Sequence, residues 1–150
     1  ELRKSLSEEL SSYISGLPGL TSPLVRKDCS HVYYGWVLDY DEKHVGVKRD
    51  LFVEALNAEG FPCYGGYCKP LYLLPVFQNR KAIGRNNFPF NLTKIEYTPG
   101  LCPIADRLHK TSLIVFQPCA YDISKKLIKE FGKAINKVYK FREELIKFKN

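Results

Sequence analysis

Cysteine and histidine are the residues of this chain that most readily supply a nucleophile, a base or a metal ligand. The chain has Cys29, Cys63, Cys68, Cys102 and Cys119, together with His31, His44 and His109. An odd number of cysteines without a secretory signal is not typical of a disulfide framework, so we expect free thiols in a reducing cytoplasm. A zinc site would need four converging ligands, and no second pair with metal spacing follows Cys63 and Cys68. A Cys–His couple stays open, because its partners need only meet in space.

Several enzyme classes leave short sequence motifs, and these are missing from the chain. Gly65-Gly66 is not a dinucleotide fingerprint, and no phosphate-binding G-K-[ST], nucleophile elbow, HExxH or EF-hand loop is present. Asn91-Leu92-Thr93 matches a glycosylation acceptor, a tripeptide that is common by chance, in a chain that we expect to be cytoplasmic. No apolar run approaches the roughly 18 residues of a membrane span, so we expect no membrane partner.

The net charge of +7 first suggests nucleic acid or another anionic partner. The excess is not spread evenly, since residues 1–120 carry 14 basic and 12 acidic side chains, a difference of +2. Residues 121–150 carry 9 and 4, a difference of +5. These lysines alternate with an apolar stripe at helical spacing, which is typical of a solvated helix face. Nucleic acid is therefore not the expected partner.

The elements that would position the chemical groups can be read from hydrophobic periodicity. Apolar residues at helical spacing predict a first helix over residues 1–16 and a last helix over 121–148, and residues 79–100 are polar and irregular, as in a long loop. The remaining expected elements are strands at 31–40 and 113–116 and short helices at 49–58 and 103–108. This order predicts one α+β domain, with helices packed as a second layer on a small mixed or antiparallel sheet.

Four segments carry a more specific signal when they are taken in order. They are the aromatic strand at 31–40, the stretch from Lys48-Arg49-Asp50 to Glu59-Gly60-Phe61-Pro62, the loop from Gly66-Tyr67-Cys68-Lys69 to Phe77, and Cys102-Pro103-Ile104-Ala105-Asp106-Arg107-Leu108. Together they resemble the small C-terminal domain of the pyridoxal-phosphate-dependent sugar aminotransferases of the DegT/DnrJ/StrS family. The opening helix with Leu17-Pro18-Gly19-Leu20 resembles the linker between that family's two domains.

The resemblance implies a function for a larger protein. It implies an aminotransferase acting on a keto-sugar or cyclitol, with glutamate or glutamine as amino donor, pyridoxal phosphate as cofactor and a homodimer as the assembly. In this family the large N-terminal domain carries the Schiff-base lysine, and no lysine of this chain stands in that context. We therefore expect no catalytic residue or cofactor ligand here, and an inactive fragment whose partner is its own large domain. A chain without methionine that begins at Glu1 agrees with this expectation.

By the same resemblance, the loop from Gly66 to Tyr72 lies near the mouth of the active site. Tyr67 and Tyr72 would then offer hydroxyl groups and stacking surface to a small polyhydroxylated substrate, and Lys69 would meet a carboxylate or phosphate. The alternative for the tyrosines is half-buried packing, and for Lys69 it is a solvated side chain. The competing function for the whole chain is a non-enzymatic basic module that binds nucleic acid or an acidic protein.

Overall fold

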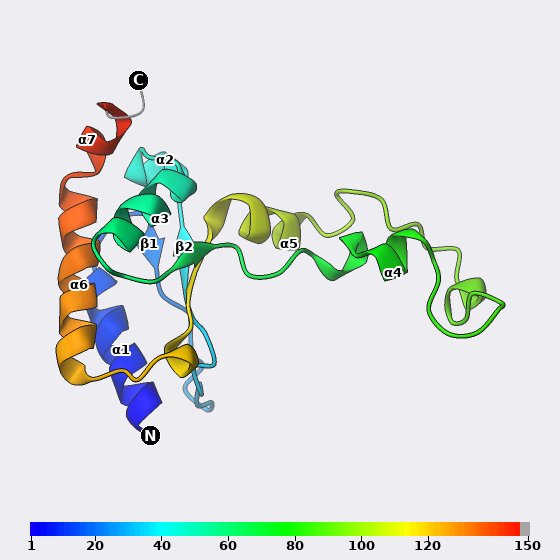
Figure 1. Ribbon diagram of the computed structural model, residues 1–150, viewed down its shortest axis with the longest axis horizontal. Helices are drawn as coiled ribbons and strands as arrows, with labels where there is room; N and C mark the ends of the chain where they lie inside the picture. Colours follow the sequence, from blue (N-terminus) through cyan, green and yellow to red (C-terminus); the bar gives the residue numbers. More distant parts are fainter. Residues whose placement is uncertain (148–150) are drawn as a thin grey trace.

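The computed structural model describes residues 1–147 and has an antiparallel sheet with helices laid against it (Figure 1). Its strands are β1 (Leu20–Thr21), β2 (Trp36–Tyr40), β3 (Tyr64–Gly65) and β4 (Leu113–Phe116), and they lie in the order β1-β2-β4-β3. The longest pairing joins β2 to β4, with Trp36 opposite Phe116 and Asp39 opposite Leu113. The predicted two-layer α+β class is confirmed, and the sheet is antiparallel throughout the described residues.

The helices of the body lie mainly along one side of this sheet (Figure 1). α1 and α6 pack against each other, and α3 contacts α6. A π-helical turn over Leu108–Ser112 continues α5 towards β4. The helices are α1 (Leu2–Ile14), α2 (Glu42–Val45), α3 (Arg49–Ala58), α4 (Pro75–Gln78), α5 (Pro103–Arg107), α6 (Lys125–Lys140) and α7 (Arg142–Lys147).

Two of the predicted elements have the wrong limits. The strand expected at 31–40 begins only at Trp36, because Tyr33 has a φ of +49°, which an extended strand cannot contain. The single helix expected over 121–148 is two helices, since α6 starts after the capping hydroxyl of Ser124 and ends at Lys140, with Phe141 between it and α7. Arg142 turns the chain there by donating to the carbonyl oxygens of Val45 at 3.0 Å and Tyr139 at 2.8 Å. Residue 148 lies outside the described residues.

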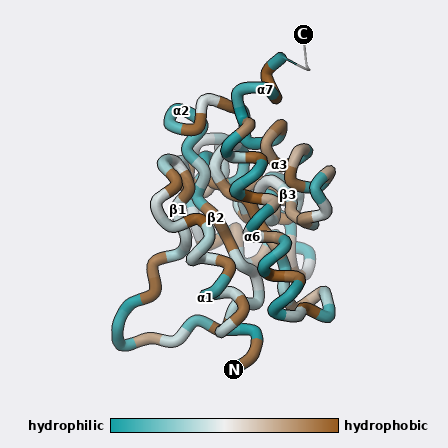
Figure 2. The backbone as a smooth tube through the Cα atoms, turned by 90° about the vertical axis from the view of Figure 1, so that its left-hand side faces the viewer, coloured by the Kyte–Doolittle hydropathy of each residue, from teal (hydrophilic) through white to brown (hydrophobic). Residues whose placement is uncertain are grey.

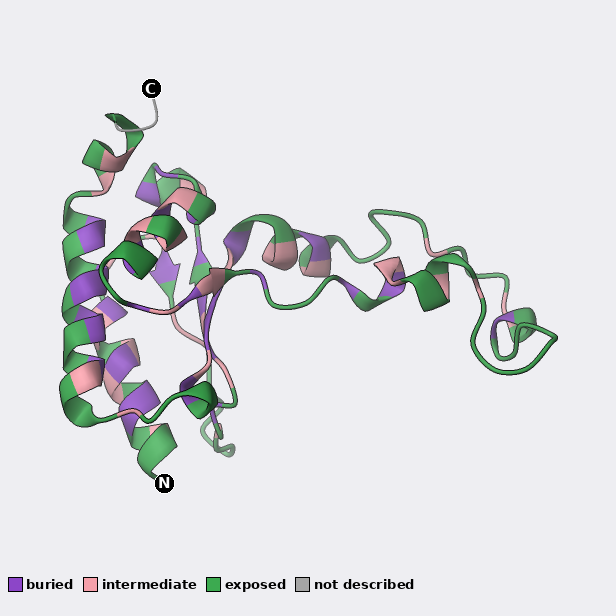
Figure 3. Ribbon diagram, viewed as in Figure 1, coloured by how far each residue is buried: buried purple, intermediate pink, exposed green. Residues whose placement is uncertain are grey.

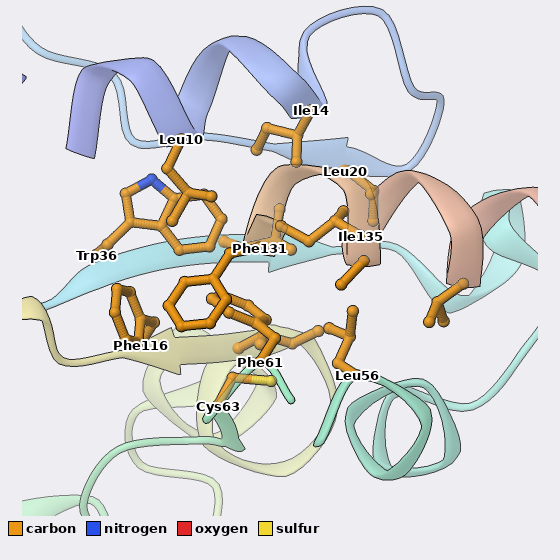
Figure 4. Packing of buried hydrophobic residues seen from close by; sticks show 14 of the residues in the cluster. Leu10, Ile14, Leu20, Trp36, Leu56, Phe61, Cys63, Phe116, Phe131 and Ile135 are labelled. Atoms are coloured by element: carbon orange, nitrogen blue, oxygen red, sulfur yellow. The ribbon is translucent and has the colours of Figure 1, made fainter. Parts of the chain in front are cut away.

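The core is built around aromatic rings from separate parts of the chain (Figure 4). The ring centroid of Phe61 lies 4.9 Å from that of Phe131 on α6, 5.2 Å from that of Phe116 on β4 and 6.3 Å from that of Trp36 on β2. Leu10 and Ile14 of α1 close the same cluster, and both are fully buried. The indole N–H of Trp36 is satisfied by the Ser11 hydroxyl at 2.9 Å. These contacts tie the sheet to its helical layer.

The basic helix α6 is amphipathic, as its apolar spacing predicts, and hydrophobic and hydrophilic residues alternate along it in Figure 2. Its buried side includes Ile128, Phe131 and Ile135. All lysines of α6 are exposed; the ammonium group of Lys137 bonds both oxygens of Glu59 at 2.8 Å, and that of Lys133 bonds Glu130 at 2.9 Å. The positive charge is therefore a solvated helix face.

Buried acidic groups of the core predict a loss of stability at high pH. Burial raises the pKa of the Cys63 thiol to about 12, and burial likewise raises the pKa of Tyr40. Both groups are protonated in the folded protein. Their contribution to the free energy of unfolding is therefore complete below their pKa values in the unfolded chain, and it is lost as the pH rises through their pKa values in the folded protein.

We expect a thiol reagent at pH 8 to label the exposed Cys29, Cys68, Cys102 and Cys119 but not Cys63. Two quantities are measured: the number of thiols per chain that react in the native and in the denatured protein, and the melting temperature between pH 8 and 12. One additional thiol should react on denaturation, and the melting temperature should fall across the upper part of this pH range. Rapid native labelling of Cys63 would contradict the packing described for the core.

Candidate functional site

A groove lies at the base of a long arm that leaves the body between β3 and α5. We call residues 71–102 the arm; it carries α4 and projects clear of the sheet and its helices (Figure 1). The groove measures about 280 Å³ and its walls are mainly apolar. It is lined by Tyr67, Cys68, Lys69, Pro70, Leu71, Ala105, Leu108, His109 and Leu113. Two of the three residues predicted from the sequence, Tyr67 and Lys69, are brought together here.

The loop after β3 can enter this position because two glycines precede it. Gly66 has a φ of +68°, and its N–H donates to the carbonyl oxygen of Leu113 at 2.7 Å. A Cβ atom on Gly66 would lie 2.7 Å from the carbonyl oxygen of His109, and one on Gly65 would lie 2.7 Å from Nε of Arg49. The glycine pair therefore allows the backbone to approach the π-helical turn and the Arg49 side chain.

Arg49, the first residue of α3, holds the loop after β3 and the π-helical turn together. Its side chain is only 6% exposed, and its Nη1 donates to the carbonyl oxygen of His109 at 2.9 Å. Nε and Nη2 both donate to Oδ1 of Asp50, at 2.9 and 2.8 Å. A buried guanidinium group thus joins α3 to the turn that carries His109 and supports the loop that carries Tyr67 and Lys69.

Tyr67 reaches out of the groove towards a second tyrosine. Its hydroxyl donates to the Tyr34 hydroxyl at 3.2 Å, and the two rings meet edge to face with centroids 6.5 Å apart. This hydrogen bond, with some desolvation, raises the pKa of Tyr67 to about 12. Tyr67 is 51% exposed, so its neutral hydroxyl and one ring face are available to a ligand.

Lys69 and His109 are the other polar groups of the groove. Lys69 is exposed, and its ammonium group can meet an anion at the groove's edge. His109 stands on the π-helical turn, and its Nδ1 is buried without a hydrogen-bond partner among the described residues. An apolar wall with one cation and few neutral polar groups suits a ligand that combines an anionic group with a hydroxylated ring.

Tyr72 lies apart from this pair. It is only 6% exposed, and its hydroxyl bonds the carboxylate oxygens of Asp106 at 2.6 and 2.7 Å. The same oxygen accepts the N–H of Gly100 at 3.0 Å, so Tyr72 joins both ends of the arm to α5. Its expected contact with a substrate stays a prediction, and that contact would require these bonds to be exchanged.

Replacing Tyr72 with phenylalanine tests this structural role. The change removes the acceptor of the Gly100 amide while keeping the ring, so we expect hydrogen exchange at Gly100 and its neighbours to become about tenfold faster. Exchange in the core strand β4 should not change, which provides an internal control. Unchanged exchange across residues 98–102 would show that the Tyr72 hydroxyl does not hold the arm.

Sequence reasoning missed Arg49 and His109 as parts of this site. Arg49 and the carbonyl that it binds are 60 residues apart, and only the fold brings them together. The adjacent Gly65 and Gly66 were the available signal, because a glycine pair inside an otherwise apolar stretch indicates a close backbone approach.

Other parts of the described chain are weaker candidates for a functional site. A larger groove of about 460 Å³ lies between α3, α6 and α7; of its three charged side chains, Glu59 and Lys137 pair with each other and Glu144 is the third. No group of three or more side chains suited to a metal ion occurs among residues 1–147. Within the same residues, no helix has the length and apolar character needed to cross a membrane.

The residues present do not form a site for pyridoxal phosphate. That cofactor needs a lysine amine held beside its ring, and every described lysine is exposed except Lys4, whose side chain is still 41% exposed and lies near Glu8 on α1. No described lysine lies in an enclosed, water-free site that would hold its amine beside the cofactor ring.

The fold of the chain matches part of two solved structures, one of them an aminotransferase, in agreement with the fold that the sequence resemblance predicted. It is similar to the crystal structure of DesI with its TDP-sugar product, with a TM-score of 0.67 and 15% identity over 99% of this chain. It is also similar to the aminotransferase from Psychrobacter cryohalolentis, with a TM-score of 0.67 and 21% identity over 91% of this chain.

A curated protein is also similar to this chain in sequence. The spore coat polysaccharide biosynthesis protein SpsC of Bacillus subtilis (strain 168) is 28% identical over 87 residues, which is 58% of this chain. No family model matches the chain. The chain spans 33% of each of the two structures and 22% of SpsC, so each of these proteins has a large part without a counterpart here.

Proposed function

We propose that this chain is the small domain of a pyridoxal-phosphate-dependent aminotransferase that acts on a keto-sugar or cyclitol. The observation that carries the proposal is the match of nearly the whole chain to one third of two solved structures, one of an aminotransferase and one of DesI with its TDP-sugar product. Glutamate or glutamine would supply the amino group, and the enzyme would be a cytoplasmic homodimer. Pyridoxal phosphate, held by a larger domain, would supply the amino-transfer chemistry.

The role of the chain's own residues would be to bind and enclose the acceptor. Tyr67 would place a neutral hydroxyl and a ring face against the acceptor ring, and Lys69 would meet its anionic group. The apolar wall from Leu71, Ala105 and Leu108 would exclude water from that side. Residues 1–16 would join the two domains. Because no described lysine is enclosed, the chain alone would be inactive.

The alternative of a basic binding module is not favoured. Its cationic surface would have to gather in a groove, whereas the lysines of α6 point to solvent and two of them pair with Glu130 and Glu59. Of the similar proteins, one is an aminotransferase, one has a TDP-sugar product and one takes part in polysaccharide biosynthesis, and none is named as a nucleic-acid-binding protein.

Two variants of the full-length protein test the role of the groove. Lys69→Ala removes a charged hydrogen-bond donor, and we expect the KM for the acceptor to rise about 10- to 100-fold while the KM for the donor amino acid is unchanged. Tyr67→Phe should raise the acceptor KM by less than about tenfold. Steady-state kinetics with each substrate varied in turn is the measurement.

Lys27→Ala is a matched control, because Lys27 is exposed and lies outside the groove. It should leave both KM values unchanged. If both groove variants kept the wild-type KM for the acceptor, Tyr67 and Lys69 would not be part of the substrate site.

A further inference from the structure

Tyr34 lies at the rim of the groove, beside Tyr67. The Tyr67 hydroxyl donates to the Tyr34 hydroxyl at 3.2 Å, and the thiol of Cys119 donates to the backbone carbonyl oxygen of Tyr34 at 3.1 Å. Tyr34 is nevertheless 58% exposed, and the loop at residues 67–69, between β3 and the arm, is exposed as well (Figure 3). Contacts to its backbone and to its hydroxyl therefore hold an accessible side chain in place.

The hydroxyl groups of this pair differ from those of the buried tyrosines. The hydroxyl groups of Tyr40, Tyr72 and Tyr139 donate their protons to a carbonyl oxygen or a carboxylate inside the protein. Tyr67 gives its proton to Tyr34, whereas the proton of Tyr34 has no acceptor among the described residues. The pair therefore presents one free donor, on Tyr34, beside the free lone pair of the Tyr67 oxygen.

A neutral donor and a neutral acceptor 3.2 Å apart match two neighbouring hydroxyl groups of a ligand. One ligand hydroxyl would donate to the Tyr67 oxygen, and the oxygen of the next would accept the proton of Tyr34. An ionised carboxylate has acceptors only and would leave the Tyr67 oxygen unpaired. The bond to Tyr34 raises the pKa of Tyr67 to about 12, so Tyr67 stays a neutral phenol at physiological pH. The pattern therefore selects a vicinal diol, as on the ring of a sugar or cyclitol.

We propose that Tyr34 and Tyr67 together bind a vicinal diol of the amino acceptor, which makes Tyr34 a specificity-determining residue. This inference rests on the proposed function, which makes the groove a binding site for the acceptor. The acceptor ring would lie on the exposed face of Tyr67, with its diol towards Tyr34 and its anionic group towards Lys69. An acceptor without neighbouring hydroxyl groups at this edge of its ring would bind less tightly, because the two tyrosine groups would lose their partners.

The binding of two anionic probes to the full-length, cofactor-loaded protein tests this inference. One probe, myo-inositol 1-phosphate, has a ring with cis and trans neighbouring hydroxyl groups, and the other, cyclohexyl phosphate, has the same carbon ring and anion without them. We expect Tyr34→Phe to raise the Kd of myo-inositol 1-phosphate about 3- to 10-fold, because one neutral hydrogen bond is lost, and to leave that of cyclohexyl phosphate within about twofold. Isothermal titration calorimetry measures both.

Tyr121→Phe is the matched control, because Tyr121 is 49% exposed and lies outside the groove. It should leave both Kd values unchanged, and circular dichroism with thermal unfolding should show that both variants keep the fold. Three results would each overturn the inference: a wild type that does not bind myo-inositol 1-phosphate, an unchanged Kd for this probe in Tyr34→Phe, or an equal rise in Kd for both probes.

Amino transfer is measured on the same preparations, which separates this inference from the proposed function. An active enzyme whose affinity for myo-inositol 1-phosphate does not depend on the Tyr34 hydroxyl would refute the diol site alone. A protein that shows the expected dependence but releases no 2-oxo acid from glutamate or glutamine would refute the enzyme function alone.

Discussion

Replacing Arg49 with alanine is expected to lower the free energy of unfolding by about 3 kcal/mol, because it leaves a buried gap and a carbonyl group without its charged donor. The carbonyl oxygen of His109 would lose its charged donor at 2.9 Å, and the backbone at Gly65 would lose the side chain against which it packs. For a chain of this size the melting temperature should fall by roughly 6–12 °C, which thermal unfolding followed by circular dichroism measures.

Two further variants separate burial from charge at this position. Arg49→Lys keeps the charge and most of the aliphatic stem, and should recover about half of the lost stability. Asp50→Asn is the control, because the Asp50 side chain is 74% exposed and its pairing with Arg49 is worth about 1 kcal/mol or less. If Arg49→Ala were no more harmful than Asp50→Asn, the buried guanidinium group would not be what supports the loop.

Gly132→Ala is the second change with a large expected effect. We expect it to destabilise the protein, although helix propensity alone would predict a gain in stability. In the middle of α6, alanine should stabilise the helix by about 1 kcal/mol. A Cβ atom at this position would overlap the ring of Tyr13 on α1, however, so the two helices would have to separate. Overpacking of this kind costs about 1–3 kcal/mol, and we expect a net loss of stability in denaturant unfolding.

A double-mutant cycle isolates this contact. In a Tyr13→Ala background the ring is absent, so Gly132→Ala should become neutral or stabilising. Lys133→Ala, at the exposed neighbouring position, should change stability by less than about 0.5 kcal/mol. A stabilising effect of Gly132→Ala in the wild type would contradict the close packing of α1 on α6.

Local sequence patterns predicted the elements whose limits depend on nearby residues. The helix from Arg49 to Ala58 and the strand from Leu113 to Phe116 have the predicted limits, because helical spacing and an apolar β-branched run each define them locally. The break at Phe141 could not be predicted, since it depends on Arg142 reaching the carbonyl oxygen of Val45, 97 residues away. Nor did composition show that Tyr33 adopts a left-handed conformation.

The site was predictable only in part. The family resemblance selected the loop of Tyr67 and Lys69, and the structure places both on one groove. Nothing in the spacing of Tyr72 indicated that Asp106 would bond its hydroxyl, since the two residues are 34 positions apart. The long irregular segment at 79–100 was expected, but its order was not, because the bonds of Arg80 and the contacts of Phe77 form only in three dimensions.

Under the proposed function, this chain completes an aminotransferase whose cofactor lies in another domain. The most direct measurement is the donor half-reaction: the full-length protein, loaded with pyridoxal phosphate, is mixed with glutamate or glutamine, and released 2-oxo acid is counted. No acceptor needs to be known. We predict about one equivalent per subunit from the full-length protein and none from residues 1–150 alone. Release by residues 1–150 alone, or none from the folded, cofactor-loaded full-length protein with either donor, would contradict the account.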